Sequence, residues 1–191
     1  MHEVERLKTE ILNCTHCPLS ETRTHAVPGE GPKDAEIVFI GEAPGRQEDL
    51  QGRPFVGRAG RILDSMLDSA GISREEVFIT NVVKCRPPEN RDPQNEEIAA
   101  CRPYLVEQIS AIRPRFIVTL GRFAMRLVLE MFGVEAGSIG EMHGQVITVS
   151  QGGAVFTVIP MYHPAASIYN RQVRADLEDD FQTLGRLLRG E

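Results

Sequence analysis

Short apolar runs alternate with amphipathic stretches along most of this 191-residue chain. Four of the runs are rich in Val, Ile and Phe and have the length of buried strands. They cover residues 36–40, 77–83, 116–120 and 155–159. The pattern therefore predicts four buried strands separated by helices.

The amphipathic stretches repeat apolar residues at helical spacing. A first helix is expected over residues 4–12, and the later apolar faces are Ile62, Leu63, Met66, Leu67 and Ala70; Ile98, Cys101, Leu105 and Ile109; Phe123, Leu127 and Met131; and Leu177, Phe181, Leu184 and Leu188. Strands that alternate with helices form a parallel sheet that is covered on both faces. We predict an α/β fold in which residues 1–191 form a single domain.

Composition agrees with a folded chain, since 41% of the residues are hydrophobic and 25% are charged. No apolar stretch approaches the roughly 18 residues of a membrane span. The polar N-terminus also lacks the apolar core of a signal peptide. We therefore expect a cytoplasmic protein that has no membrane partner.

Charge is unevenly distributed along the chain. The net charge of −6 by itself argues against nucleic acid as a partner. The field at a surface, however, depends on how the charges are distributed and not on their total. Residues 110–129 contain four arginines and no carboxylate, whereas residues 176–180 contain four acids. Two interpretations stay open for the arginines: a basic face that contacts nucleic acid, or a solvated arginine-rich surface.

Polar residues follow the predicted strands, beside glycine or proline. Glu42 and Glu48 come after the first strand, Asn81 lies in the second, Phe55 lies in the loop 53–60, and His163 follows the last strand. Sites in parallel sheets lie at the carboxyl ends of the strands, so these loops should converge. They lack both Gly-x4-Gly-Lys-Ser/Thr and Gly-x-Gly-x2-Gly, so nucleoside triphosphate chemistry is not expected.

These residue types suit recognition of a nucleobase. An amide can read the hydrogen-bonding edge of a base, an aromatic ring can stack on it, and an imidazole can stabilise developing negative charge. Each residue also has a structural alternative: Phe55 as core, Asn81 as a loop cap, His163 as a satisfied structural histidine, and Glu48 as a helix-start acid. In combination they favour binding and cleavage of an extruded base.

The four cysteines are all that the chain has, and they are placed as Cys14-x2-Cys17, Cys85 and Cys101. The first pair has metal-ligand spacing, so a shared site would tie the N-terminus to the middle of the fold. Pro18 favours iron–sulfur weakly, although zinc also accepts four thiolates. The alternatives are four unlinked buried thiols or two disulfides, the latter being rare in a reducing compartment.

Several motifs follow one another in a specific order. They are Cys14-x2-Cys17; Gly-Glu-Ala-Pro-Gly at 41–45 with Glu48-Asp49; Pro-Phe-Val-Gly-Arg-Ala-Gly at 54–60; Thr-Asn-Val-Val-Lys-Cys-Arg-Pro-Pro at 80–88; and His-Pro-Ala at 163–165. Through their order and combination the chain resembles the family-four uracil-DNA glycosylases, an iron–sulfur class, over nearly its full length.

The resemblance implies a doubly wound, three-layer fold with a central sheet of four parallel strands and helices on both faces. It also implies a structural 4Fe–4S cluster on Cys14, Cys17, Cys85 and Cys101. The implied activity is hydrolysis of the N-glycosidic bond of uracil in single- or double-stranded DNA. Uracil would be the product, the protein would act as a monomer, and a sliding clamp or another repair protein is a candidate partner.

Site roles are implied as well. Phe55 would stack on the flipped uracil, and Asn81 would read its edge. His163 would donate to the uracil oxygen as the leaving group becomes anionic. Glu42, together with the backbone at Ala43, would position the attacking water.

Two further positions complete the implied site, because Glu48 would crowd the place of the thymine methyl group and Asn90 would support the catalytic geometry. One related class has Gly-Leu-Ala-Pro-Ala in the first motif, and the presence of Glu42 speaks against it. Another class has a Lys-Arg-Arg-Ile-His insertion, which has no counterpart in residues 86–95. His143 would either touch DNA or face solvent.

Two other kinds of function stay open. A catalytically inactive iron–sulfur module would bind DNA with an affinity that His163→Ala leaves unchanged. A cluster-bearing electron carrier would show a reversible redox signal and would need neither Asn81 nor His163. The presence of Glu42, Asn81, Asn90 and His163 in one chain favours the enzyme.

Overall fold

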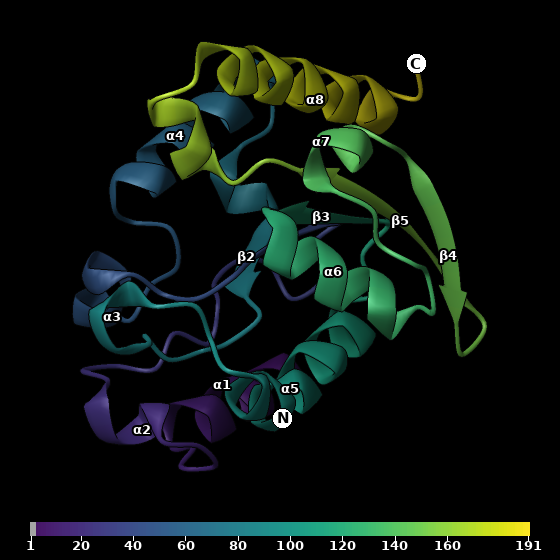
Figure 1. Ribbon diagram of the computed structural model, residues 1–191. Helices are drawn as coiled ribbons and strands as arrows, with labels where there is room; N and C mark the ends of the chain where they lie inside the picture. The colour runs from purple at the N-terminus through teal and green to yellow at the C-terminus, as the bar shows by residue number, and fades with distance from the viewer. Residues whose placement is uncertain (1–2) are drawn as a thin grey trace.

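A five-stranded sheet forms the centre of the computed structural model, which describes residues 3–191 (Figure 1). The strands are β1 (Ile37–Gly41), β2 (Phe78–Asn81), β3 (Phe116–Leu120), β4 (Ile147–Gln151) and β5 (Ala154–Met161). Their order is β2-β1-β3-β5-β4; β2, β1, β3 and β5 run parallel, and β4 is antiparallel to β5. Strands β1, β2 and β3 are buried along their whole length, as parallel strands covered on both faces should be.

The predicted α/β fold is confirmed, and the four predicted strands are the four parallel ones. The strand count is corrected from four to five because β4 escaped the hydrophobic pattern. Only Val149 of β4 is buried, so this edge strand has no apolar run. A two-residue turn joins it to β5, and both turn residues, Gly152 and Gly153, have positive φ (58° and 80°). Such a turn is the favoured connection of a tight hairpin.

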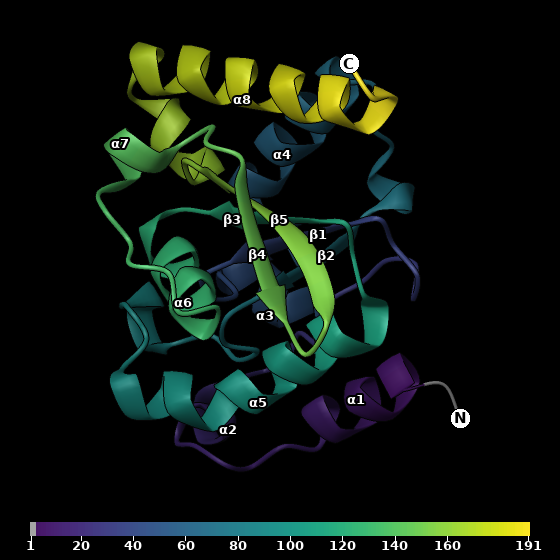
Figure 2. The ribbon, with the colours of Figure 1, turned by 90° about the vertical axis from the view of Figure 1, so that its right-hand side faces the viewer.

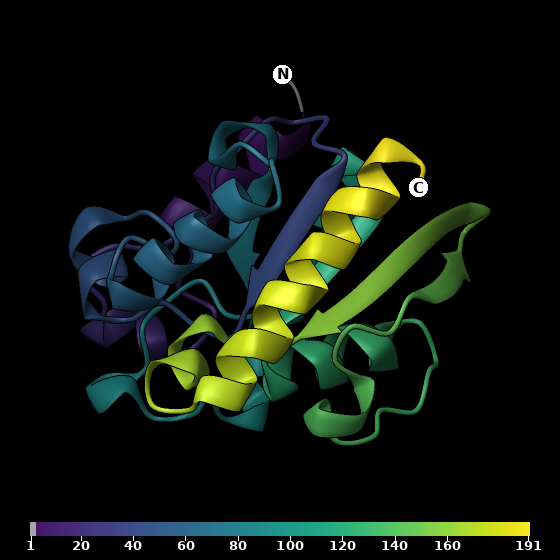
Figure 3. The ribbon, with the colours of Figure 1, turned by 90° about the horizontal axis from the view of Figure 1, so that it is seen from above.

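Helices cover both faces of the sheet. The helices α4 (Arg58–Ser69) and α8 (Arg171–Arg189) pack on one face, while α1 (Glu3–Leu12), α5 (Asn95–Ile112) and α6 (Arg122–Met131) lie on the other (Figure 2). Figure 3 shows α8 extended over the sheet alongside β1. Shorter helices lie in the connections: α2 (Leu19–Thr22), α3 (Arg46–Gln51), α7 (Ile139–Met142), and the 3-10 turns η1 (Arg74–Glu76), η2 (Pro88–Asn90) and η3 (Pro164–Ile168).

The predicted helical faces match the buried ones except in α6. The expected face of Phe123, Leu127 and Met131 is only half-buried. The buried stripe is instead Ala124, Met125, Val128 and Leu129. Since α6 is apolar around most of its circumference, helical spacing alone allowed two stripes. No helix within residues 3–191 has the length and apolar character needed to cross a membrane.

Candidate active site

A pocket of about 150 Å³ lies where β1, β2 and β5 end. Its lining is Ala43, Gly45, Glu48, Phe55, Ala59, Asn81 and His163. Five of the residues singled out in the sequence are thus brought together, although they come from four separate segments of the chain. An apolar cavity of about 150 Å³ takes up one benzene molecule, so this pocket is of a size for a single pyrimidine ring.

Asn81 is the last residue of β2, and its side chain is almost completely buried. Its Oδ1 atom receives no hydrogen bond from residues 3–191. Leaving a buried acceptor unpaired costs about 1–3 kcal/mol, so the atom is suited to a ligand that brings a donor. Gly41 makes room for this amide, because a Cβ there would lie 2.4 Å from Oδ1 and 2.7 Å from the Phe55 ring.

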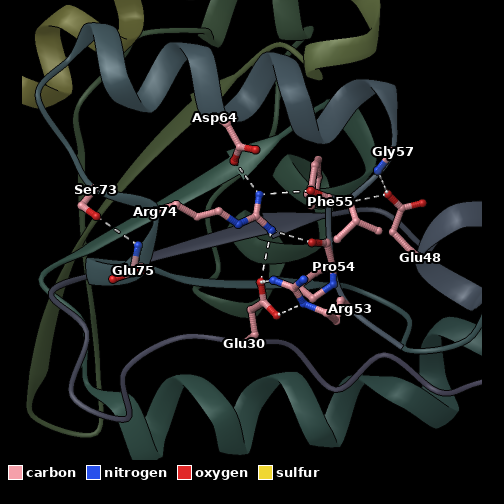
Figure 4. A network of polar contacts seen from close by, with 11 residues as sticks. Glu30, Glu48, Arg53, Pro54, Phe55, Gly57, Asp64, Ser73, Arg74 and Glu75 are labelled. Atoms are coloured by element: carbon pink, nitrogen blue, oxygen red, sulfur yellow. Dashed lines mark hydrogen bonds and ion pairs between the residues drawn. The ribbon is translucent and has the colours of Figure 1, made fainter. Parts of the chain in front are cut away.

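Phe55 has a strained backbone conformation, with φ at 48°. The guanidinium of Arg74 holds this turn: Nη1 donates to the Phe55 carbonyl (3.0 Å) and to Asp64 (2.6 Å), and Nη2 donates to the Pro54 carbonyl (2.6 Å) (Figure 4). Gly60 lets helix α4 approach, since a Cβ there would lie 1.9 Å from the Phe55 oxygen. The Phe55 ring therefore lines the pocket because of contacts made by its backbone.

Glu48 is tied to the same turn. Its Oε1 accepts the backbone N–H groups of Val56 (2.9 Å) and Gly57 (2.8 Å), and the latter bond is drawn in Figure 4. Gly45 allows the carboxylate to come close, since a Cβ there would lie 2.8 Å from Oε2. Glu48 is thus fixed in the pocket wall, where its role against thymine stays a prediction.

His163 presents one ring nitrogen as a donor. Its Nδ1 accepts the backbone N–H of Ala165 (3.1 Å). A neutral imidazole that accepts at Nδ1 carries its proton on Nε2. Burial lowers the pKa of His163 to about 4, against a smaller opposing effect of the Glu48 charge. The ring is therefore neutral at pH 7, and it lies 5.8 Å from the Phe55 ring between centroids.

Glu42 and Asn90 do not line this pocket. Glu42 is half-buried; burial raises its pKa, the charge of Asp92 adds to this, and Arg122 opposes it. Asn90 is exposed, and its Oδ1 accepts a hydrogen bond from Arg86 Nε (2.7 Å). The roles expected of both residues stay predictions.

His143, whose role the sequence left open, is bound to helix α8. Its Nδ1 lies 3.0 Å from Oδ2 of Asp180, and its ring centroid lies 4.8 Å from that of Tyr162. Burial raises the pKa of Asp180 to about 6, although the hydrogen bond with His143 opposes the shift. The imidazole therefore contacts protein groups on two sides.

The four cysteines line one pocket of their own, on the α1 and α5 side of the sheet. All four are free thiols, so the structure does not contain the two disulfides that the sequence left open as an alternative. Within residues 3–191, no three Cys, His, Asp or Glu side chains surround a common point as the ligands of a single ion do. Cys14, Cys17, Cys85 and Cys101 form a set of four thiols chemically suited to an iron–sulfur cluster or to zinc.

Two of these sulfur atoms accept hydrogen bonds. Arg23 Nη1 donates to Cys85 Sγ (3.0 Å), and the backbone N–H of Lys84 donates to Cys101 Sγ (3.3 Å). Burial raises the pKa of Cys85, and it raises that of Cys101 to about 11. Binding of a metal group would therefore displace protons from these thiols.

Lys84 lies within the motif at residues 80–88, but no role was expected for it. It is almost fully buried, and its Nζ donates to Thr80 Oγ1, to the Asn81 carbonyl and to Gln108 Oε1, each at 2.7 Å. Burial lowers the pKa of Lys84 to about 8. One sequence signal could have found it: Lys84 directly follows two valines at the end of a predicted buried strand. A lysine buried at such a place needs hydrogen-bonding partners.

Most of this chain matches a known protein family. The profile described as "Uracil DNA glycosylase superfamily" matches residues 28–185. The chain belongs to this superfamily, and its similarity places it with the type-4 members, as the sequence motifs predicted.

Curated relatives that carry the name "Type-4 uracil-DNA glycosylase" match nearly the whole chain. The protein of Archaeoglobus fulgidus is 50% identical over 98% of this chain and 94% of its own length. The protein of Sulfurisphaera tokodaii is 48% identical over 98% and 86%, and that of Saccharolobus solfataricus is 47% identical over 98% and 88%.

Proposed function

We propose that this protein removes uracil from DNA by hydrolysing the N-glycosidic bond of an extruded deoxyuridine, which leaves an abasic site. The main support is the buried Asn81 amide, whose Oδ1 accepts no hydrogen bond from the described residues, in the wall of a pocket sized for one pyrimidine. An asparagine amide can donate to uracil O4 and accept from uracil N3–H. Cytosine has a donor and an acceptor in the reverse places, so it would leave both protein groups unpaired.

His163 supplies the stabilisation of the leaving group. When the bond between C1′ and N1 breaks, the sugar becomes cationic and the uracil ring accumulates negative charge. The Nε2–H of His163 donates to the uracil oxygen, and this bond strengthens as charge develops. One such donor contributes about 3 kcal/mol to the transition state, or about two decades in rate.

Glu42 acts on the water in this proposal. The water oxygen bonds to C1′ as the base leaves, and its proton passes to the Glu42 carboxylate, while the backbone at Ala43 holds the water. A raised pKa makes Glu42 a better proton acceptor. Glu48 excludes thymine by occupying the space of its methyl group, and Asn90 supports the loop that follows Asn81.

We also propose that Cys14, Cys17, Cys85 and Cys101 hold a structural 4Fe–4S cluster. Their common pocket and the N–H donors aimed at two of the sulfur atoms support it. The bound cluster would cross-link the N-terminal segment, the loop after β2 and helix α5. Equal amounts of iron and acid-labile sulfide, four of each per chain, are expected; stoichiometric zinc without iron would contradict the proposal.

The activity is tested with an oligonucleotide that contains one uracil. After incubation, alkali cleaves the strand at any abasic site, and the products are separated on a gel. Strand breaks are expected with the wild-type protein and at least tenfold fewer with His163→Ala at equal protein concentration. If the wild type makes no more breaks than this variant, the protein is not a glycosylase of this kind, and retained DNA binding would then indicate an inactive binding module.

A further inference from the structure

A second pocket, of about 350 Å³, lies beside the uracil pocket and is rich in arginine. We call this pocket the arginine groove. Its polar lining consists of Arg58, Arg61, Ser65, Ser167 and Arg174. The groove takes residues from α4, η3 and α8, and it contains no carboxylate in its lining. This set of groups suits an anion.

The groove and the uracil pocket are built on the same two elements. Arg58 lies in the groove, and the next residue along α4, Ala59, lines the uracil pocket. On η3, Ser167 lies in the groove, while His163, which caps the start of that turn, lines the uracil pocket. A strand of nucleic acid with one base in the uracil pocket would therefore have its neighbouring backbone at the groove.

The positive charge of the groove is mostly uncompensated. The Arg61 guanidinium has no hydrogen bond or ion pair with any residue in the described part of the chain, although the Arg61 backbone N–H donates to the Gly57 carbonyl (3.1 Å). Among residues 3–191, the Arg58 guanidinium has a hydrogen bond or ring interaction only with Tyr169, whose ring centroid lies 5.7 Å away. Arg174 is paired with Glu178 at 3.0 Å, but both side chains are about half-exposed, so solvent screens the pair.

We infer that the arginine groove binds backbone phosphates of the DNA strand that carries the extruded nucleotide. The inference rests on the proposed function, because it assigns the surface that grips the substrate of that site. Guanidinium groups bind phosphate with two parallel hydrogen bonds, and such contacts set the register of a strand on a protein. A chain with a net charge of −6 needs a local positive surface of this kind to bind DNA.

The test uses the double variant Arg61→Gln/Arg174→Gln, which leaves the Phe55 turn untouched. Its control is Arg186→Gln, also exposed on α8, whose side chain has, among residues 3–191, a hydrogen bond only to Thr183 Oγ1. Affinity for a uracil-free oligonucleotide is measured from 50 to 200 mM salt. Each lost phosphate contact lowers the slope of log affinity against log salt concentration by about 0.7 for single strands and 0.9 for duplex. The slope of the double variant should therefore be smaller by the equivalent of one or two contacts, and its affinity should be about tenfold or more lower.

Uracil excision is measured on the same proteins. The double variant should lose excision activity through a higher KM. If excision occurs but the double variant binds DNA with the slope and affinity of Arg186→Gln, the groove does not contact phosphate. If the wild type excises nothing while the double variant still loses DNA affinity, the proposed function fails and the groove assignment stands. Thermal unfolding of each variant shows whether any loss comes from misfolding.

Discussion

Replacing Arg74 with methionine tests whether the strained Phe55 turn depends on the Arg74 side chain. We call the hydrogen bonds from this side chain to the Pro54 and Phe55 carbonyls the clamp. The change keeps most of the side-chain length but removes the donors to the Pro54 and Phe55 carbonyls. It also removes the ion pair with Asp64 and the longer one with Glu30 (3.4 Å). Hydrogen bonds from a charged group contribute about 1.5–3 kcal/mol each. Asp64 is 44% exposed, so its pairing is screened and adds little.

The energy lost is comparable with the strain that the clamp holds. Two such bonds amount to about 3 kcal/mol or more, and a residue in the left-handed region costs about 1–3 kcal/mol. Without the clamp, Phe55 should relax to negative φ, which carries its ring out of the pocket. If the stacked conformation falls to between a tenth and a hundredth of molecules, kcat/KM falls by about 10- to 100-fold.

The assay is single-turnover excision from a uracil-containing oligonucleotide, combined with thermal unfolding. Arg53→Met is the matched control, because Arg53 is 57% exposed and bonds to Glu30 at the outer side of the same network. Arg74→Lys should stay impaired, since one ammonium cannot replace a planar fork that reaches four oxygens. If Arg74→Met lowers the melting temperature but excises uracil as fast as Arg53→Met, then Phe55 does not depend on the clamp.

Three further outcomes are expected. Gly41→Ala should lower kcat/KM by at least tenfold, because the new Cβ would collide with both Asn81 and Phe55; near-normal excision would show that the pocket adapts. The pKa of His163 is about 4 in the folded protein, against about 6.5 in the unfolded chain. Between these pH values the unfolded state binds a proton that the folded state does not bind, so the free energy of unfolding falls as pH is lowered from 6.5 to 4. The melting temperature of His163→Gln should depend less on pH in that window, and equal pH dependence would contradict the assignment. Cys101→Ser should reduce visible absorbance and thermal stability together, since the thiol joins α5 to the loop after β2; a colourless wild type would refute the cluster.

Helical spacing and apolar runs predicted the four parallel strands and the long helices around the site, but not α3, which carries Glu48, or the η3 turn that His163 caps. Parallel strands buried on both faces need continuous apolar sequence, so the apolar runs at 36–40, 77–83 and 116–120 predicted β1, β2 and β3 to within one or two residues. The edge strand β4 could not, because it has one buried side chain and takes its place from its hairpin with β5. The buried stripe of α6 was equally undetermined, since neighbouring elements choose between its two apolar sides.

The sequence by itself determined the fold class and the residue types of the pocket, because both follow from local patterns: apolar runs, and polar residues next to glycine or proline at strand ends. Only the tertiary structure decided how these groups are held. Arg74 reaches a carbonyl 19 residues away, and Lys84 bonds to Gln108 across 24 residues. The placement of the arginine groove beside the uracil pocket likewise joins residues more than 100 positions apart. Such contacts depend on how helices pack against the sheet, and a polar residue with a distant partner looks in the sequence like any other surface charge.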